Sequence, residues 1–316
     1  MVIRLYLKEE QTMVHGTHNA KHDNRNKHIY IYVNGSFFTR NEAKISVFDS
    51  GYLVGDGIWE GIRLTKGRLV FLEEHLNRLW QAAKSTSINL PFSMEELKSI
   101  IYQTTEKNSM EDGVHVRVMI TRGIKKTPSQ DPRLTISGPN VVVIPEFKIA
   151  DESSKNTGLT LFTSTIRRGS PDYLDPKLNC HSKLHEVQAL VQAIEAGADE
   201  ALMLDIHGFV STCNSTNFFM VKNGTVITST DQYCMNGITR QKIIEICKEN
   251  QIPVIEKNFS LYDVYDADEC FVTGTFAGLS PVISIDGRMI KNKSNTKISE
   301  SLSSLYKKKI SSYVKN

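Results

Sequence analysis

A short Gly-Ile-Thr run, from Gly237 to Thr239, is the strongest candidate for an anion-binding site in the chain. Apolar residues with helical spacing follow from Ile238 to Asn250, so the run falls at the start of a predicted helix. The first backbone N–H groups of a helix have no partner within the helix, and the helix dipole is positive at that end. The run is therefore predicted to bind an anionic group such as a phosphate.

A second candidate is the long segment from Ile124 to Pro139, which is basic and contains prolines. A connection of that length inside a compact domain is usually a binding loop or a lid. Its cations could clamp a carboxylate, as arginine does through two parallel hydrogen bonds, although charges in a loop are more often simply solvated. The cations in and beside this segment are Arg122, Lys125, Lys126 and Arg133.

Two glycines, Gly55 and Gly57, could in principle belong to a dinucleotide-binding loop. The full spacing is G-x-G-x-x-x-G, and the residues that follow have the pattern of a strand. The Rossmann interpretation needs a helix there and fails its own structural condition. The chain also lacks the G-x-x-x-x-G-K-[ST] loop of nucleoside triphosphate-binding proteins.

Composition and charge narrow the class of protein. The 316 residues are 40% hydrophobic and 23% charged, which is normal for a soluble globular protein long enough for two domains. The formal net charge of +3 is spread along the chain, so we expect neither nucleic acid nor a membrane surface as a partner. No apolar run could span a bilayer, and Lys8, Glu9 and Glu10 interrupt any secretory segment. A cytoplasmic protein is expected.

Metal-ligating residue types do not form a recognisable site. The five cysteines are odd in number, widely spaced and without a C-x-x-C pair, which argues against a disulfide framework and against zinc. Residues 1–28 are polar and irregular, and we interpret them as an extension that forms no ordered element. Histidines in this extension could bind a metal, but no metal site is predicted.

Strands and helices alternate irregularly, which predicts two α+β domains instead of a doubly wound sheet. A smaller domain is predicted over 29–148, a linker over 149–157 and a larger domain over 158–316. Hairpin turns are predicted where Asn-Gly, Lys-Gly or Asp-Gly pairs separate apolar runs, and Ser93 with Glu96 forms a predicted capping box. The expected elements are hairpins at 29–38, 58–71, 218–226 and 282–290, strands at 114–120, 140–147, 159–167, 200–204 and 269–272, and helices at 72–85, 93–107, 183–196, 238–250 and beyond Ser294.

Several motifs, taken in order, resemble those of class IV pyridoxal-phosphate enzymes. This group holds branched-chain aminotransferases, D-amino acid aminotransferases and aminodeoxychorismate lyases, and the resemblance covers most of the chain from about Ile29 to Arg288. It implies the two-domain α+β architecture of D-amino acid aminotransferases (fold type IV), with pyridoxal 5'-phosphate between the domains and a homodimer contributing residues across the cleft. The motifs are Gly55-Asp-Gly-Ile-Trp-Glu-Gly-Ile-Arg63, Glu74-His-Leu-Asn-Arg-Leu79, Ala198-Asp-Glu-Ala-Leu-Met-Leu-Asp205, His207-Gly-Phe-Val-Ser-Thr-Cys-Asn-Ser-Thr-Asn-Phe-Phe219, Asn236-Gly-Ile-Thr-Arg240 and Thr273-Gly-Thr-Phe-Ala277.

By this resemblance, Lys177 is the Schiff-base lysine, because the family's lysine lies after the first long strand of the second domain and before a helix. It would bind the cofactor and move the proton between the substrate carbon and the cofactor's aldehyde carbon. A lysine whose pKa is depressed suits both tasks. The local sequence Lys-Leu-Asn-Cys-His-Ser-Lys allows the alignment to slip, so Lys183 is the alternative, and Lys177 could also be a solvated loop lysine.

The resemblance also assigns contacts to the cofactor's phosphate and to the substrate. Arg78 matches the phosphate arginine of Glu-His-x-x-Arg-Leu, Gly237, Ile238 and Thr239 match the phosphate-binding helix start, and Thr275 matches a hydroxyl contact. A helix cap, a surface arginine and a core tryptophan are the structural alternatives for such residues. The substrate candidates are Trp59, Arg122, Phe276 and Ala277.

The chain departs from the family's pattern at two positions. Thr212 stands where the family has an acidic partner for the cofactor's pyridine nitrogen, and a neutral hydroxyl holds positive charge on that nitrogen less well. We hypothesise that Thr212 weakens the ring as an electron sink; unchanged half-reaction rates in a Thr212→Glu variant would count against this. The second departure is that the ring-hydroxyl tyrosine of branched-chain aminotransferases has no counterpart, and Ser182 or Lys183 lies near that place.

The function implied by the resemblance is a transaminase that moves an amino group between an α-amino acid, branched-chain-like, and an α-keto acid. One alternative is a lyase of the aminodeoxychorismate type, although such lyases usually keep the acidic residue that Thr212 replaces. Another is a catalytically impaired relative that acts as a binding protein. The presence together of Lys177, Arg78 and the Gly237–Thr239 run argues against this second alternative.

Overall fold

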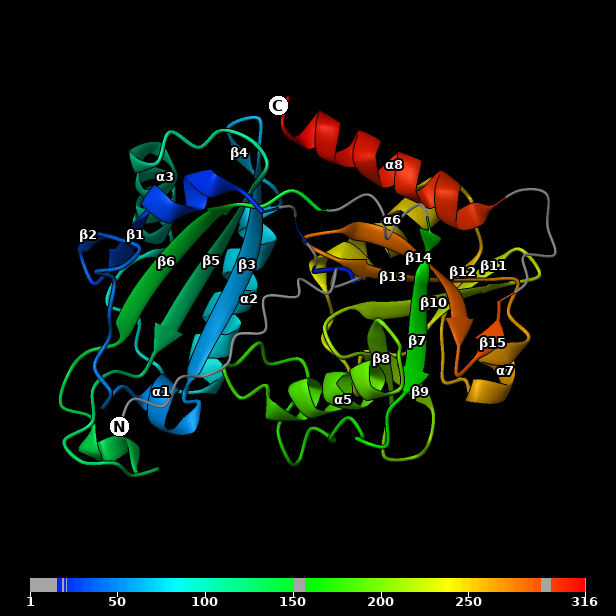
Figure 1. Cartoon of the computed structure of the whole chain (residues 1–316), viewed down its shortest axis with the longest axis horizontal. Coiled ribbons are helices and arrows are strands. Elements are labelled where there is room, and N and C mark those ends of the chain that lie inside the picture. The colour runs from blue at the N-terminus through cyan, green and yellow to red at the C-terminus, as the bar shows by residue number, and fades with distance from the viewer. Residues whose placement is uncertain (1–15, 19, 21, 151–156, 291–296, 316) are drawn as a thin grey trace.

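The computed structural model describes residues 16–18, 20, 22–150, 157–290 and 297–315, and it contains two β-sheets placed side by side (Figure 1). The first sheet has six strands in the order β2-β1-β6-β5-β3-β4. The second has nine, in the order β12-β11-β10-β13-β14-β7-β8-β9, with β15 paired to β14. The α+β class expected from the sequence is confirmed.

The first sheet is antiparallel throughout, and helices α2 and α3 cover it. Apolar residues alternate along β5, which places Val114, Val116 and Val118 in the core and their neighbours on the opposite face. Helix α3 begins at the predicted capping box of Ser93 and Glu96. The elements are η1 (Asn24–His28), β1 (Tyr30–Val33), β2 (Ser36–Thr39), α1 (Ser50–Val54), β3 (Gly57–Thr65), β4 (Arg68–Leu69), α2 (Leu72–Ser85), α3 (Met94–Lys107), β5 (Val114–Thr121), η2 (Pro132–Leu134) and β6 (Asn140–Phe147).

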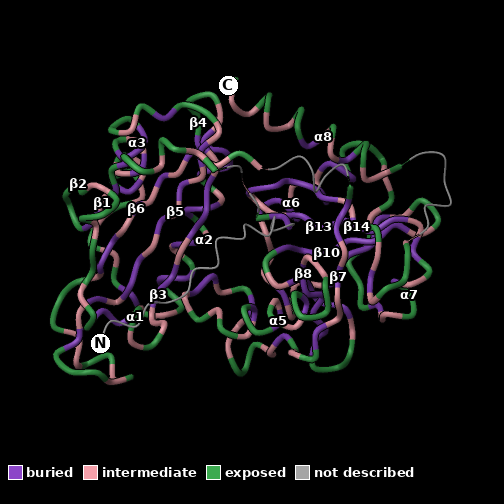
Figure 2. Tube along the Cα trace, in the orientation of Figure 1, coloured by how far each residue is buried: buried purple, intermediate pink, exposed green. Residues whose placement is uncertain are grey.

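The second sheet is mixed: β7 pairs in parallel with β8 and β14, whereas β10, β13 and β14 are antiparallel neighbours. Its central strands are buried on both faces, as Figure 2 shows, because helices pack against them. In β8, Met203 packs with helix α5 and Leu204 belongs to a different core cluster. The elements are β7 (Leu159–Thr163), α5 (Leu184–Glu195), β8 (Glu200–Leu204), β9 (Val210–Cys213), β10 (Asn217–Lys222), β11 (Thr225–Thr228), α6 (Ile238–Glu249), β12 (Val254–Glu256), α7 (Leu261–Tyr265), β13 (Glu269–Gly274), β14 (Gly278–Ile285), β15 (Arg288–Met289) and α8 (Ile298–Tyr313).

The structure differs from the sequence-based expectation in several segments. The strand expected over 159–167 ends at Thr163, and α1, β9, β12 and α7 were not expected. Within the predicted N-terminal extension, residues 1–15 lie outside the described part, while Thr17 donates hydrogen bonds to Glu200 and 24–28 form η1. Most of the predicted linker over 149–157 also lies outside the described residues. Over the part of the chain that is described, no helix has the length and apolar character needed to cross a membrane.

Candidate active site

A cavity of about 370 Å³ lies between the two sheets and draws residues from both. Strands β3 and β5 and helix α2 line it on one side, whereas the starts of α5 and α6, strand β9 and the end of β13 line it on the other. Its volume is within the range of small-molecule and cofactor sites. The segment that leads into α5 is fastened to β3, because Asn179 donates to the Trp59 carbonyl at 2.7 Å and Trp59 Nε1 donates to the Cys180 carbonyl at 3.1 Å.

One end of the cavity is formed by the start of helix α6. Gly237, Ile238 and Thr239 all line it, with Gly237 as the N-cap residue, as the sequence predicted for the helix start. A Cβ atom on Gly237 would collide with Asn217 Oδ1, so only glycine fits this close approach of backbone and side chain. Thr275, from the turn after β13, lines the same cavity. Free N–H groups and a hydroxyl thus meet where an anion can bind.

Arg78 points into this cavity from α2 and is held in place by a buried carboxylate. Its Nε and Nη2 atoms donate to the two carboxylate oxygens of Glu60 at 2.7 and 2.8 Å, and its Nη1 atom donates to the Asn236 carbonyl at 3.3 Å. His75, one turn earlier on α2, also contacts Glu60, at 2.7 Å. Burial alone would raise the pKa of Glu60, but the Arg78 charge and the hydrogen bonds from Arg78 and His75 outweigh it and lower the pKa.

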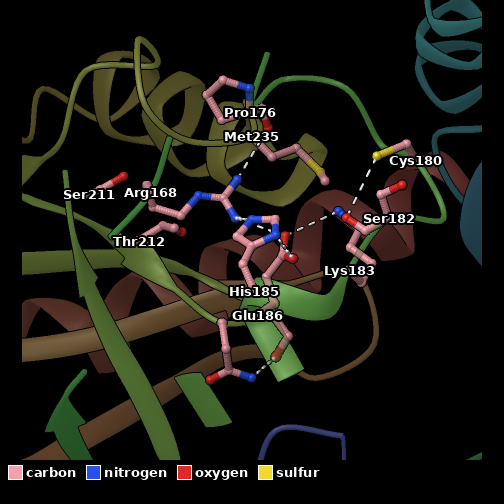
Figure 3. Close-up of polar contacts among 12 residues, drawn as sticks. Arg168, Pro176, Cys180, Ser182, Lys183, His185, Glu186, Ser211, Thr212 and Met235 are labelled. Carbon is pink, nitrogen blue, oxygen red and sulfur yellow. Dashed lines mark hydrogen bonds and ion pairs between the residues drawn. The ribbon is translucent and has the colours of Figure 1, made fainter. Parts of the chain in front are cut away.

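Lys183 lines the cavity from the N-cap position of α5 (Figure 3), and the other described lysine in the lining is Lys148. The Nζ atom of Lys183 is 3.3 Å from Glu186 Oε1, and the same carboxylate receives Arg168 Nη1 at 2.8 Å and His185 Nδ1 at 2.9 Å. Burial alone would raise the pKa of Glu186. The hydrogen bond from His185 and the charges of Lys183 and Arg168 reverse that effect and lower the pKa to about 2. Glu186 is therefore ionised at neutral pH.

The structure does not bring Lys177 into the cavity. Its side chain is exposed and does not line the cavity, and its backbone N–H donates to Asp175 Oδ1 at 2.9 Å. Of the two candidate lysines, the cavity contains the alternative, Lys183, and which lysine holds a cofactor stays a prediction. The physical reason is local: the chain still runs along the surface at Lys177 and turns inward only through Asn179 and Cys180, which are buried against β3.

Thr212 lines the cavity from β9 and is buried. Its hydroxyl donates to the Thr216 carbonyl at 2.7 Å. Because that bond uses the hydroxyl proton, the oxygen lone pairs are what Thr212 presents to the cavity, and no negative charge accompanies them. Glu186 is the one acidic side chain among the cavity-lining residues that the structure describes.

The other end of the cavity is aromatic and cationic. The Arg117 guanidinium lies over the Trp59 ring at 4.1 Å, and Lys148 Nζ lies over the Phe276 ring at 4.6 Å. His115, two residues before Arg117 on β5, contacts the edge of Phe276. Burial lowers the pKa of Arg117 and of Lys148, and it lowers the pKa of His115 to about 3, so this histidine is neutral at physiological pH.

Some predicted substrate residues lie elsewhere. Trp59 and Phe276 line the cavity, but Ala277 is buried beside it and does not. Arg122 is outside the cavity because Asp56 binds its guanidinium through two hydrogen bonds, at 2.6 and 3.0 Å, and the Thr86 carbonyl accepts a third. In the basic loop, Lys125 Nζ donates to the Asp131 carbonyl, and Arg133 pairs with the Asp131 carboxylate. These contacts stabilise the loop itself, and none of the four cations named from this segment lines the cavity.

Sequence reasoning missed five polar side chains that line the cavity: His115, Arg117, Lys148, Arg168 and Glu186. The expected strand at 114–120 already carried a signal, because residues that alternate with its buried valines must share the opposite face. His115 and Arg117 are two of these residues. Lys148, Arg168 and Glu186 carried no comparable signal, since their approach to the cavity depends on how the second sheet packs against the first.

Comparison with known proteins agrees with this geometry. A family model described as amino-transferase class IV matches residues 57–285. A putative branched-chain-amino-acid aminotransferase of Methanocaldococcus jannaschii is 39% identical over 88% of this chain and 95% of its own length. Branched-chain-amino-acid aminotransferase-like protein 2 of Arabidopsis thaliana is 36% identical over 97% of this chain, which spans about half, 55%, of that relative. A solved branched-chain amino acid aminotransferase complexed with N-(5'-phosphopyridoxyl)-L-glutamate superimposes with a TM-score of 0.83 at 28% identity, covering 90% of this chain and 95% of that one.

The fold and the cavity define a pyridoxal-phosphate-type aminotransferase scaffold. The chain belongs to the class IV aminotransferase family, a family of pyridoxal-phosphate-dependent transaminases, as the motifs predicted. The matched residues, 57–285, include most strands of both sheets and all the described cavity-lining residues except His18.

Proposed function

We propose that this protein binds pyridoxal 5'-phosphate through Lys183 and transfers an amino group between a branched-chain-like α-amino acid and an α-keto acid. One observation carries the proposal. Lys183, Arg78, Thr275 and the Gly237–Thr239 helix start, which are far apart in the sequence, line a single cavity. An amine and an anion site that face the same space are what this cofactor requires of a protein.

The cavity residues fit the cofactor in other respects. Two buried oxygen atoms of lining residues, Asn179 Oδ1 and Thr273 Oγ1, have no hydrogen-bond partner among the described residues, and a bound polar ligand would satisfy them. The N-cap residue of α6, Gly237, has no side chain, and no described side chain caps the first N–H groups of this helix. Arg78, fixed by Glu60, supplies a cation beside these N–H groups.

Each lining residue has a distinct role in this proposal. When bound, pyridoxal phosphate supplies an aldehyde that links covalently to amines and a ring that withdraws electrons. Lys183 Nζ would hold the cofactor until the substrate's amine displaces it, and the freed amine would then carry the proton that leaves and returns to the substrate carbon. Arg78 and the start of α6 would orient the phosphate, and Thr212 would offer the ring a neutral oxygen. Trp59 and Phe276 exclude water from the reacting face.

The aromatic and cationic end of the cavity supports amino acid and keto acid substrates. Every such substrate has a carboxylate, and Arg117 with Lys148 provides two cations in a partly apolar wall. The adjoining rings of Trp59 and Phe276 suit an aliphatic side chain. This combination supports the branched-chain-like substrate class in the proposal.

We further propose that the active form is a homodimer, as the resemblance implied. Helix α5, whose start carries Lys183, exposes a row of large apolar side chains spaced by three or four residues, and such a face is typical of an interface. The row is Leu184, Val187, Val191 and Ile194, with exposed fractions of 70%, 54%, 46% and 62%. Val187 also lines the cavity, so a partner that covered this row would close the cavity on that side.

The test of this function is a half-reaction screen with the cofactor-loaded protein. Leucine, isoleucine, valine, glutamate and D-alanine are each added in single-turnover experiments, and conversion of the cofactor from its aldehyde to its amine form is followed by absorbance. We expect conversion with the branched-chain L-amino acids and its reversal by 2-oxoglutarate. Release of pyruvate from aminodeoxychorismate, with no conversion by any of these amino acids, would instead support the lyase alternative.

A further inference from the structure

The carboxylate of Glu186 is the unusual feature of the proposed cofactor end of the cavity. It lies one turn after Lys183 on α5, is only 8% exposed, and has an oxygen atom 3.3 Å from Lys183 Nζ. Figure 3 shows the two side chains pointing toward each other beside Arg168 and His185. A lysine whose only task was to be a reactive amine would need no buried acidic partner, so this arrangement requires an explanation.

The surrounding charges show why this carboxylate matters. The cations that line the cavity come from four other parts of the fold: Arg78 from α2, Arg117 from β5, Lys148 after β6, and Arg168 after β7. The lining histidines are His18 and His115, and burial lowers the pKa of His115. Such cations make a further positive charge in this cavity less favourable. Glu60, which does not line the cavity, pairs with Arg78, and Glu186 is the one acidic side chain among the cavity-lining residues described.

The neutral side chain of Thr212 strengthens this reasoning. The family's acidic partner of the pyridine nitrogen is replaced by Thr212, whose hydroxyl is neutral and whose proton is donated to the Thr216 carbonyl. No negative charge from β9 therefore compensates for protons held in the cavity. The negative charge sits instead on α5, next to the amine nitrogen.

We propose that Glu186 is a positioning residue that holds Lys183 Nζ in the cavity and raises its affinity for a proton while the nitrogen is linked to the cofactor. Arg168 holds the Glu186 carboxylate in direction through a hydrogen bond of 2.8 Å to Oε1, and His185 Nδ1 lies 2.9 Å from Oε2. Glu186 itself neither accepts the substrate proton nor touches the substrate. This inference rests on the proposed function, because it assumes that Lys183 carries the cofactor.

The experiment measures the pKa of the lysine–cofactor nitrogen from the pH dependence of its visible absorbance. Wild type is compared with Glu186→Gln, with Glu186→Asp and with Glu195→Gln, a matched control at an exposed glutamate on the same helix. We expect Glu186→Gln to lower the proton affinity of the nitrogen by about tenfold or more, as expected for loss of an opposite charge at this distance. Glu186→Asp should restore part of the loss, and Glu195→Gln should match wild type.

The outcomes separate this inference from the proposed function. If borohydride fails to attach the cofactor to Lys183 in wild type, the proposed function fails first. If the cofactor is on Lys183 but Glu186→Gln titrates like wild type, the role of Glu186 is overturned. Should Glu186→Gln not fold, because Arg168 loses its buried partner, Glu186→Asp decides: a moderate decrease in proton affinity supports the proposal, and an unchanged value overturns it.

Discussion

The two ends of the cavity hold their cations in different ways. At the α6 end, Arg78 is bound by both oxygens of the buried Glu60, at 2.7 and 2.8 Å, so its position is fixed before any ligand arrives. At the other end, Arg117 and Lys148 rest on the rings of Trp59 and Phe276. A site fixed in advance loses little entropy on binding, which suits one unvarying ligand. Cations that rest on aromatic rings can adjust to ligands of different shape.

This difference matches the roles proposed for the two ends, which are cofactor binding at the α6 end and substrate binding at the aromatic end. The phosphate of a cofactor has one geometry, whereas a transaminase must accept an amino acid and a keto acid in turn. We therefore expect substitutions at the α6 end to change cofactor affinity and substitutions at the aromatic end to change substrate KM. Lys183 lines the same cavity, and in the proposed function it serves both cofactor and substrate, so its loss should affect both functions.

The largest effect is expected from Lys183→Ala. Loss of the group that moves the substrate proton should lower the half-reaction rate by about 10²- to 10⁴-fold or more. The measurement is single-turnover absorbance with added pyridoxal phosphate. The matched control is Lys177→Ala, which removes an exposed lysine six positions away and should react like wild type. If Lys177→Ala is inactive and Lys183→Ala retains activity, the assignment of the two lysines is reversed.

Gly237→Ala should weaken cofactor binding by about tenfold or more. The added Cβ would collide with Asn217 and push the α6 N–H groups out of position, at the cost of a charge-assisted hydrogen bond. Cofactor Kd is measured by absorbance titration, with Gly138→Ala as the control because a Cβ there meets nothing within 4 Å. An unchanged Kd accompanied by a higher substrate KM would contradict the division between the two ends.

Arg117→Met should raise KM for the keto acid by about 10- to 100-fold, the cost of a hydrogen bond to a charged group, and leave cofactor Kd unchanged. Arg122→Met is the contrasting variant. Its guanidinium binds Asp56 and backbone carbonyls, so we expect lower thermal stability and an unaltered KM. Equal KM values in the two variants would show that Arg117 does not contact the substrate.

The smallest expected effect is the contribution of His115 to the pH dependence of folding stability. Its pKa is about 3 in the folded protein against an ordinary value of 6.5, because burial disfavours the charged ring. The unfolded chain takes up a proton as pH falls below 6.5, whereas the folded chain does not, so stability is lost from pH 6.5 down to about 3. Urea unfolding should show a smaller loss over this interval for His115→Gln. A parallel loss in both proteins would mean that His115 is protonated in the fold.

The sequence predicted elements that depend on neighbouring residues. Helix α2 over Leu72–Ser85 and the capping box of α3 follow from local spacing, and the turns at Asn34-Gly35 and Asn223-Gly224 have the positive φ values that such pairs tolerate. The start of α6 could be located for the same reason. These features need no knowledge of the other sheet.

The sequence could not decide features set by distant contacts. Lys177 and Lys183 lie in one irregular segment, and only the attachment of Asn179 to Trp59, 120 positions away, determines which lysine turns inward. Arg122 looked free to bind a carboxylate because its partner, Asp56, is 66 positions earlier. The place of Glu186 in the cavity could not be predicted for a related reason, because no residue near it in the sequence indicates that Arg168 contacts it.

The most direct test of the account is to locate the cofactor on the chain. The protein is loaded with pyridoxal phosphate, reduced with borohydride and digested, and the modified peptide is sequenced by mass spectrometry. The account predicts the phosphopyridoxyl group on Lys183, with Lys177 unmodified at one equivalent of cofactor. Modification of Lys177, or of surface lysines at random, would contradict it.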